Sequence, residues 1–302
     1  MPLLSQLGTE AFRNVLENLP FAVYLVDPER RIIFWNDGCE RITGHLRHEV
    51  IGRCCADHLL MHCDENVDAL CGSACPLVDT MHDGRPREAD IFLRHRHGQR
   101  IPVHVRAVPL RDEHGAIIGA CECFEERALS APEHSKLHLV ELPVSVDEVT
   151  GVPDRHATLR RLQSELADYQ ASSLPFGVLC LAIDETDHLR AEDGGNAVKK
   201  VMHATAQTLS KCAGVGNFVG RWSDVHFLVI IRACSQEMLM DYAMRLKRLA
   251  ALESVPWWGG QLTITLSAGG TMARKEDTAE DLARRGEEAL NAGSGVNRAA
   301  VI

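Results

Sequence analysis

The sequence has 302 residues, of which 45% are hydrophobic and 25% charged, a composition typical of a globular protein with room for two ordinary domains. Its 42 acidic residues outnumber its 32 basic ones, and the resulting net charge of −10 argues against electrostatic binding to nucleic acid. The first twenty residues lack the basic start and apolar core of a signal peptide, and no apolar run reaches the roughly 18 residues of a membrane span. We therefore expect a cytoplasmic protein that does not associate with a membrane.

The first half of the chain predicts an antiparallel meander of short strands. Apolar, β-branched runs alternate with turn signals, and the His-Gly pairs at 97–98 and 114–115 suit tight hairpin connections. Short helices and loops are expected between the two groups of strands, over residues 38–85. The predicted strands are 21–27, 31–36, 89–95, 101–110 and 116–125.

Five of the eleven cysteines fall within residues 54–75 and form the strongest chemical signal in the chain. Without an export signal, cysteines in a chain of this size are thiols or metal ligands rather than disulfides. Cys71 and Cys75 are four residues apart, so one helical turn can present both on one face. With Cys55 and His62 they make the pattern Cys-x₆-His-x₈-Cys-x₃-Cys. Three thiolates and an imidazole suit zinc, and thiolates also hold iron–sulfur clusters, so these four residues are the predicted metal site.

Other uses of the same cysteines stay open. They can form a thiol–disulfide switch, or they can be reduced structural residues, with Cys54, Cys63 and His58 as spare ligands. A haem on His82 is a further alternative that we rank below zinc or an iron–sulfur cluster. The cysteines outside the cluster, including the pair at 121 and 123, are expected to be small buried hydrophobes.

The second half predicts long amphipathic helices alternating with apolar strands. Ser235 and Thr278 suit helix N-caps, and Asp281 completes a sequence that resembles a capping box. Trp257 and Trp258 are expected to be packing residues. The apolar strands suit central positions in a sheet that is covered on both faces. The predicted helices lie around 159–169, 198–209, 235–249 and 278–293, and the predicted strands are 176–183, 227–231 and 262–266.

Residues 127–146 predict a linker between the two halves. The segment contains two prolines and no sustained heptad of apolar residues. A rigid coiled coil needs apolar a and d positions over several heptads, so we do not expect one here.

Residues 10–126 resemble a PAS domain. The resemblance rests on three segments in the family's order and spacing: NLPFAVYLVDPERRIIFWN (18–36), GCERITGHLRHEVIGR (38–53) and DEHGAIIGACECFEE (112–126). It implies a five-stranded sheet with a ligand cavity under short helices, and a sensory or dimerising role.

Residues 147–302 resemble the GGDEF domain of diguanylate cyclases. The segment DEVTGVPDR (147–155) is similar to the family's D-x-L-T-G-L-x-N-R, and GEEALNAGSGVNR (286–298) is similar to the family's closing motif. The resemblance implies a nucleotidyl cyclase-like fold that makes cyclic di-GMP from GTP where its metal and nucleotide ligands are present.

The sequence departs from that family at the residues that carry the chemistry. In the family, an Arg-aromatic pair precedes Gly-Gly-Asp/Glu-Glu-Phe, and RWSDVHF (221–227) stands at that place here. The two glycines, which let a phosphate approach the backbone, are replaced. The acidic metal ligand is replaced as well. Asp184 or Asp187 can still bind a cation, but the following segment is shortened and the late lysine of the family is absent. Gly214 and Asn217 occupy the places of the inhibitory R-x-x-D motif.

The sequence therefore predicts an α+β protein: a PAS-like antiparallel sheet domain (10–126), a linker (127–146) and a degenerate GGDEF-like α/β sandwich (147–302). We expect a bacterial-type regulatory protein that makes no cyclic di-GMP. Its PAS domain senses a redox, metal or small-molecule cue, and its second domain forms a homodimer or binds another signalling protein. The alternative is an active diguanylate cyclase with an atypical site.

Overall fold

The computed structural model describes residues 9–57, 59–64, 68–71, 74–127, 145–292 and 298–301, and the chain divides into two compact units. The first lies within residues 9–127, and the second is built mainly from residues 145–301. Apart from its ends, the predicted linker lies outside the described residues, as do His58 and the predicted helix end at Gly293.

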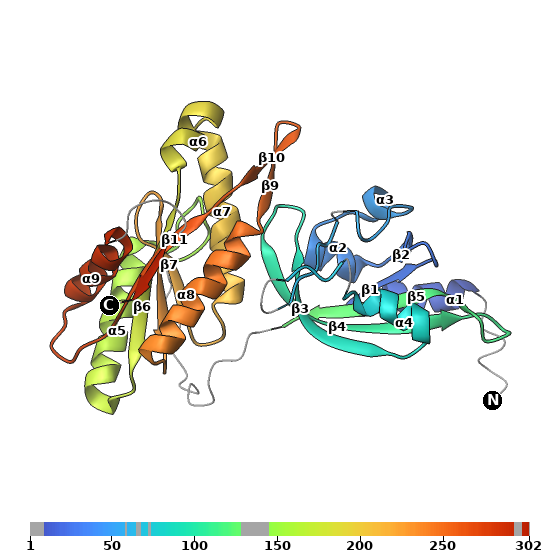
Figure 1. Cartoon of the computed structure of the whole chain (residues 1–302), viewed down its shortest axis with the longest axis horizontal. Helices are drawn as coiled ribbons and strands as arrows, with labels where there is room; N and C mark the ends of the chain where they lie inside the picture. The colour runs from blue at the N-terminus through green and yellow to red at the C-terminus, as the bar shows by residue number, and fades with distance from the viewer. Residues whose placement is uncertain are drawn as a thin grey trace. The chain divides into compact units, whose positions relative to one another are not determined.

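The first unit is a five-stranded sheet in the order β2-β1-β5-β4-β3, with short helices between β2 and β3 (Figure 1). This arrangement confirms the predicted antiparallel meander. Each observed strand overlaps a predicted one and differs from it by one or two residues at its ends. The elements are α1 Thr9–Glu17, β1 Ala22–Val26, β2 Ile32–Trp35, α2 Asp37–Thr43, α3 Arg47–Val50, α4 Pro76–Asp83, β3 Arg87–Arg94, β4 Arg100–Arg111 and β5 Ile117–Glu126.

A buried asparagine fixes helix α2 against the sheet. The Asn36 side-chain oxygen accepts from the backbone N–H of Cys39, which caps α2, and from that of Val23 on β1. An asparagine at this position satisfies one of the free N–H groups of a helix start. The same side chain therefore ends β2, starts α2 and holds α2 on β1.

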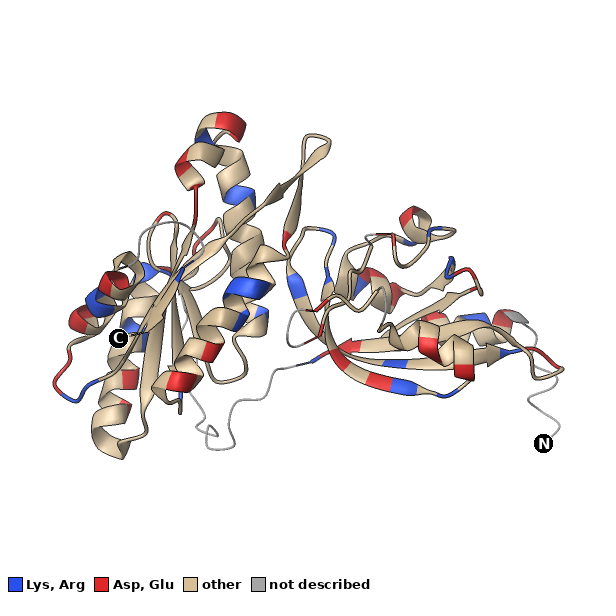
Figure 2. Ribbon diagram, viewed as in Figure 1, with Lys and Arg blue, Asp and Glu red and all other residues tan. Residues whose placement is uncertain are grey.

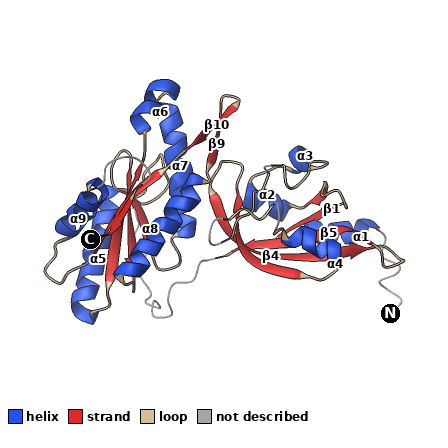
Figure 3. Ribbon diagram, viewed as in Figure 1, coloured by secondary structure: helices blue, strands red, loops and turns tan. Residues whose placement is uncertain are grey.

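The second unit is a five-stranded sheet in the order β12-β11-β6-β8-β7, covered by helices on both faces (Figure 3). The helices predicted around 159–169, 198–209, 235–249 and 278–293 are present. The elements are α5 Arg155–Ser172, β6 Phe176–Ile183, α6 Thr186–Asp193, α7 Gly195–Cys212, β7 Phe218–Arg221, β8 His226–Arg232, α8 Gln236–Ala251, β9 Ser254–Trp257, β10 Gly260–Thr263, β11 Leu266–Met272, α9 Ala279–Asn291 and β12 Ala299–Val301.

Strand β6 lies at the centre of this unit and carries no charged residue. Its side chains alternate, so that Val178 and Cys180 pack with Leu162 of α5 and Leu282 of α9. Gly177, on the other face, lies against Leu239 of α8. Figure 2 shows the consequence: the strands of this sheet are almost free of charge, whereas α9 carries acidic and basic side chains in alternation.

Two predictions in the second half were wrong. Residues 262–266 do not form a central strand, because β10 pairs only with β9 in a separate hairpin and the central strand begins at Leu266. The apolar run crosses the bend between the two strands, which its composition does not reveal. Trp258 is not a packing residue, since it is 90% exposed at the tip of that hairpin. The predicted N-caps Ser235 and Thr278 are confirmed.

Close backbone approach between β11 and α9 depends on glycine. A Cβ atom at Gly269 would lie 1.9 Å from the backbone nitrogen of Leu290 and 2.6 Å from the carbonyl oxygen of Gly286. Backbone atoms cannot rotate away as a flexible side chain can. Any other residue at this position must therefore push α9 off the sheet.

We predict that Gly269→Ala destabilises the second unit by about 2 kcal/mol or more, the cost of overpacking a close-packed core. This corresponds to a loss of about 5 °C or more in its melting temperature, measurable by calorimetry of the full chain. Gly260→Ala is the matched control, because its Cβ would meet nothing closer than 3.6 Å. Equal melting temperatures for the two variants would contradict the proposed packing.

Candidate functional site

The hairpin turn between β7 and β8, residues 222–226, is held by one arginine. Arg221 Nη1 donates to Asp147 Oδ1 at 2.7 Å, and the same guanidinium donates to the carbonyl oxygens of Ser223 and Asp224 at 3.1 Å each. Charge-assisted bonds of this kind are stronger than neutral ones. The turn therefore keeps its shape through contacts made by the chain itself.

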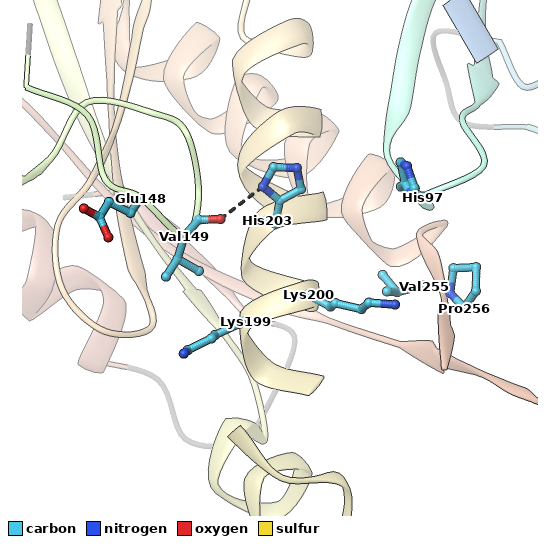
Figure 4. Close-up of a pocket in the computed structure, with 8 residues that line it drawn as sticks. All are labelled: His97, Glu148, Val149, Lys199, Lys200, His203, Val255 and Pro256. Atoms are coloured by element: carbon cyan, nitrogen blue, oxygen red, sulfur yellow. Dashed lines mark hydrogen bonds between the residues drawn. The ribbon is translucent and has the colours of Figure 1, made fainter. Parts of the chain in front are cut away.

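The opening segment, residues 147–155, is fastened to both the turn and α7. Asp147 accepts from the backbone N–H and the hydroxyl of Thr150 as well as from Arg221. Partial burial acts to raise the pKa of Asp147, but these hydrogen bonds outweigh it and hold the pKa below its usual value. His203 Nδ1 of α7 donates to the Val149 carbonyl at 3.0 Å, as Figure 4 shows. The carboxylate is thus ionised at neutral pH, and one of its oxygens, Oδ1, accepts all three of these hydrogen bonds.

A buried tryptophan links the turn to α5 and α9. Trp222 is 4% exposed, and its indole N–H donates to Glu287 Oε1 on α9 at 2.6 Å. The Arg155 guanidinium lies 4.3 Å from the centre of the indole ring and donates to the Trp222 carbonyl. Stacking of this kind adds an electrostatic attraction to apolar burial. Helices α5 and α9, the first and last helices of the second unit, therefore both hold the turn in place.

The side chains of the turn contact one another and the end of β6. Ser223 Oγ and His226 Nδ1 are 2.6 Å apart, and burial lowers the pKa of His226 although Glu287 opposes this. A neutral imidazole can accept a hydrogen bond from the Ser223 hydroxyl. The Val225 carbonyl accepts from the backbone N–H of Ile183, which places Val225 beside the last residues of β6.

Asp184 directly follows β6, and its carboxylate is already bonded. It accepts from Thr265 Oγ1 at 2.8 Å and from Ser267 Oγ at 2.7 Å. Asp187, the second predicted cation ligand, lies on α6 with its side chain 99% exposed. The structure therefore places Asp184 at the end of β6, close to the hairpin turn, whereas the side chain of Asp187 is exposed to solvent.

A polar cavity of about 720 Å³ opens at the turn. Carboxylates and guanidinium groups lie together in its wall, so it can take a polar ligand. The lining residues are Asp147, Asp154, Arg155, Arg221, Trp222, Ser223 and Asp224.

In the first unit, the four predicted metal ligands lie around a buried carboxyl that sequence reasoning missed. Glu122 of β5 is 1% exposed; it accepts from the Tyr24 hydroxyl at 2.9 Å, and His62 Nε2 lies 3.8 Å from the same oxygen. The Glu122 charge acts on all three predicted thiol ligands, and the Cys71 sulfur accepts from the backbone N–H of His62. The missed signal was a charged residue in the middle of an apolar strand.

Burial controls the charge of this cluster. It raises the pKa of the thiols of Cys55, Cys71 and Cys75, and it raises the pKa of Glu122 to about 7 despite the hydrogen bond from Tyr24. Among the residues that the structure describes, no three His, Cys, Asp or Glu side chains are arranged so as to hold one metal ion. A zinc or iron–sulfur site at these residues stays a prediction.

Comparison with known proteins identifies both units. A model of the PAS fold matches residues 10–125, and a model described as "Diguanylate cyclase, GGDEF domain" matches residues 144–295, about half of the chain. The chain belongs to the GGDEF family. A PAS domain therefore precedes a GGDEF domain, and both are signalling domains of cyclic di-GMP metabolism. Both predicted resemblances are confirmed. Within the described ranges, no helix has the length and apolar character that crossing a membrane requires.

Relatives in sequence and structure agree with this assignment. The diguanylate cyclase DgcP of Pseudomonas aeruginosa is 31% identical over 182 residues, which span 58% of this chain but only 27% of that relative. The GGDEF domain of DgcB from Caulobacter crescentus, solved with c-di-GMP, has a TM-score of 0.50 at 18% identity, over 55% of this chain and 97% of that one. The cyclase SiaD of Pseudomonas aeruginosa, solved with its activator SiaC, has a TM-score of 0.51 at 21% identity, over 52% and 61%. At such identities the structures show the fold alone.

The buried carboxyl predicts a pH-dependent stability of the PAS domain. The folded pKa of Glu122 is about 7, whereas an unfolded glutamate titrates near ~4.3, so ionisation opposes folding increasingly from the lower value up to about 7. We predict that Glu122→Gln leaves the melting temperature of this domain unchanged at pH 4.5 and raises it at pH 8, where the penalty is complete at roughly 4 kcal/mol.

Calorimetry of the full chain with a chelator present measures this difference. The matched control is Glu125→Gln, an exposed neighbour on the same strand. A Glu122→Gln variant that melts below the wild type at pH 8 would show that the ionised carboxyl stabilises the fold.

Proposed function

We propose that this chain is a regulatory protein whose PAS domain senses a cue and whose GGDEF domain makes no cyclic di-GMP. The GGDEF domain instead provides a surface for homodimerisation or for binding another signalling protein. The observation that carries this proposal is the composition and geometry of the turn at residues 222–226.

The turn lacks the groups that phosphoryl transfer requires. That reaction depends on a metal ion and on positioned charges rather than on a special nucleophile. Val225, a hydrocarbon side chain, occupies the position beside Asp184 where the family has an acidic metal ligand. Ser223 and Asp224 carry side chains where glycines let a phosphate approach the backbone. Each replacement removes a contact that the transition state needs.

The neighbouring residues support the same conclusion. Asp184 retains its carboxylate, but two hydroxyl groups of the chain already donate to it. At the inhibitory position, the Asn217 side chain donates to the Ala213 carbonyl and accepts from the Arg232 backbone N–H, so it serves the fold. The position therefore lacks both the arginine and the aspartate with which the family binds the inhibitory product.

The alternative is an active cyclase that holds its metal differently. The cavity at the turn favours it, because Asp147, Asp154 and Asp224 line that cavity and carboxylates are suitable Mg²⁺ ligands. The bonds from Arg221 and Thr150 to Asp147, and from Ala157 to Asp154, argue against it.

For the sensing half, we propose the region around Glu122 as the input site. The buried carboxyl, the Tyr24 hydroxyl and the predicted ligands Cys55, His62, Cys71 and Cys75 provide polar and soft donor groups inside an otherwise apolar core. Such a core suits a small polar ligand or a thiophilic metal ion better than an apolar ligand.

Incubation of the purified full chain with GTP and Mg²⁺ or Mn²⁺ tests the proposal, with cyclic di-GMP measured by chromatography and mass spectrometry. We expect no product from the wild type under conditions in which a known diguanylate cyclase converts its GTP. Asp184→Asn is the matched variant. Steady product formation that this variant abolishes would establish the alternative, whereas product that it leaves unchanged would indicate a contaminating cyclase.

A further inference from the structure

Two cysteines lie side by side on β5, outside the predicted metal cluster. Cys121 and Cys123 are two residues apart on one strand, so their side chains point to the same face of the sheet. Their sulfur atoms are 3.7 Å apart, within reach of a sulfur hydrogen bond. Glu122, between them, points to the opposite face and into the PAS core. The sequence predicts two small buried hydrophobes at these positions, but their sulfur atoms are close enough to interact with each other.

The two thiols differ in access to solvent. Cys121 is 8% exposed, whereas Cys123 is partly exposed and lines a surface groove of about 320 Å³. The groove gives a small solute a path to one sulfur atom of the pair. Arg106 of β4 lies directly across from Cys123 in the strand register and lines the same groove.

The surroundings favour a thiolate at the accessible position. The hydrogen bond from the Cys121 thiol is the main cause that lowers the pKa of Cys123 to about 7; burial opposes it and the Arg106 charge assists it. The same hydrogen bond, together with burial, raises the pKa of Cys121. Other titratable groups near the pair come from α2, β3, β4 and β5: Cys39, Glu88, His104, Glu122 and Glu125.

We propose that Cys121 and Cys123 form a site of reversible oxidation by hydroperoxides, with Cys123 as the attacking residue and Cys121 as the resolving one. Thiolate character, access and an adjacent resolving cysteine are the features that mark redox-sensing cysteines.

The chemistry balances with the hydroperoxide as the only oxidant. The Cys123 thiolate attacks the terminal oxygen of R–O–O–H, an S–O bond forms, the O–O bond breaks, and the alkoxide that leaves takes a proton from water. The Cys121 sulfur then attacks the sulfenic sulfur, an S–S bond forms, and hydroxide leaves with the Cys121 proton as water. Two thiols are oxidised by two electrons, and the hydroperoxide is reduced to an alcohol and water.

Closure of this disulfide must deform β5. An extended strand separates residues i and i+2 by about 6.6 Å between Cα atoms. A disulfide allows about 6.8 Å at most and usually holds its Cα atoms about 5.5–6 Å apart, so closure draws the two residues toward each other. The strand therefore shortens or twists on oxidation, and it carries Glu122, the acceptor of the Tyr24 hydroxyl, with it. A strained disulfide is also easily reduced, which suits a reversible signal. That this deformation serves as the sensory input rests on the proposed function, whereas the oxidation chemistry does not.

The sequence provides a direct readout. Trypsin cleaves after Arg111 and Arg127, and the peptide between them contains Cys121 and Cys123 as its two cysteines, while the peptide 54–87 contains all five cysteines of the cluster. The reduced full chain is treated with hydrogen peroxide, alkylated, denatured and digested. We expect peptide 112–127 to resist alkylation first, to lose the mass of two hydrogen atoms and to recover on treatment with a reductant.

Variants distinguish the two roles. Cys121→Ser is expected to leave a sulfenic acid on Cys123 that dimedone traps, and Cys123→Ser is expected to leave Cys121 reduced. Arg106→Gln slows oxidation at neutral pH, whereas Arg106→Lys, which keeps the charge, does not. Cys54→Ser is the control and leaves the oxidation of peptide 112–127 unchanged.

Two results would overturn the proposal: a peptide 112–127 that stays reduced while peptide 54–87 is oxidised, or oxidation of Cys121 in the Cys123→Ser variant at the wild-type rate. The wild-type mapping involves no substitution, so it decides the question even if a variant misfolds. The readout is also independent of any cyclase activity, so a failure here leaves the proposed function of the second domain untouched.

Discussion

The ion pair between Arg221 and Asp147 determines the shape of the GGDEF hairpin turn and of the cavity beside it. One guanidinium joins the turn carbonyls to the opening segment, and that segment is in turn fastened to α7 through His203. The pair is only partly exposed, so water competes for it less than for a surface pair. The arginine and aspartate are shared with the family motifs, whereas the turn that they support carries different side chains. Under the proposed function, the chain keeps the scaffold of the site while the catalytic groups of the turn are replaced.

In the PAS domain, the corresponding constraint is the carboxyl of Glu122. A carboxyl in an apolar core is costly unless it is neutral or hydrogen-bonded. Here Tyr24 donates to it, and burial moves its pKa into the physiological range. Its charge acts on Cys55, Cys71 and Cys75, and the strand that carries it has the Cys121 and Cys123 pair on its other face. A chemical change at Glu122 on one face of β5, or at the cysteine pair on the other, therefore acts on the same strand.

Much of the fold could be predicted because the local sequence pattern and the tertiary packing favour the same elements. Residues 176–183 form an unbroken apolar run that can only be a buried strand, and Ser235 and Thr278 have the side chains that helix starts require. The strand predicted at 262–266 ended too early, because the apolar run crosses the bend between β10 and β11. The glycines of β11, among them Gly269, are required because α9 approaches the strand backbone closely, and a single sequence does not display that tertiary demand.

The candidate sites were predictable to different degrees. The replaced residues of the turn are visible in the sequence, since a motif has a fixed order. The proximity of His62 to Glu122 was not, because it brings together residues that are 60 positions apart in the sequence. Cys121 is buried as predicted, whereas Cys123 is only partly buried and opens to a groove, which the strand pattern does not show.

The most direct test of the account is the binding of GTP to the full chain, measured by titration calorimetry with Mg²⁺ and with a chelator. A turn without its acidic ligand predicts no magnesium-dependent affinity, so the two titrations should agree and Asp184→Asn should change neither. GTP binding that requires Mg²⁺ and is lost in Asp184→Asn would contradict the account, because it would show that the site still assembles a metal–nucleotide complex.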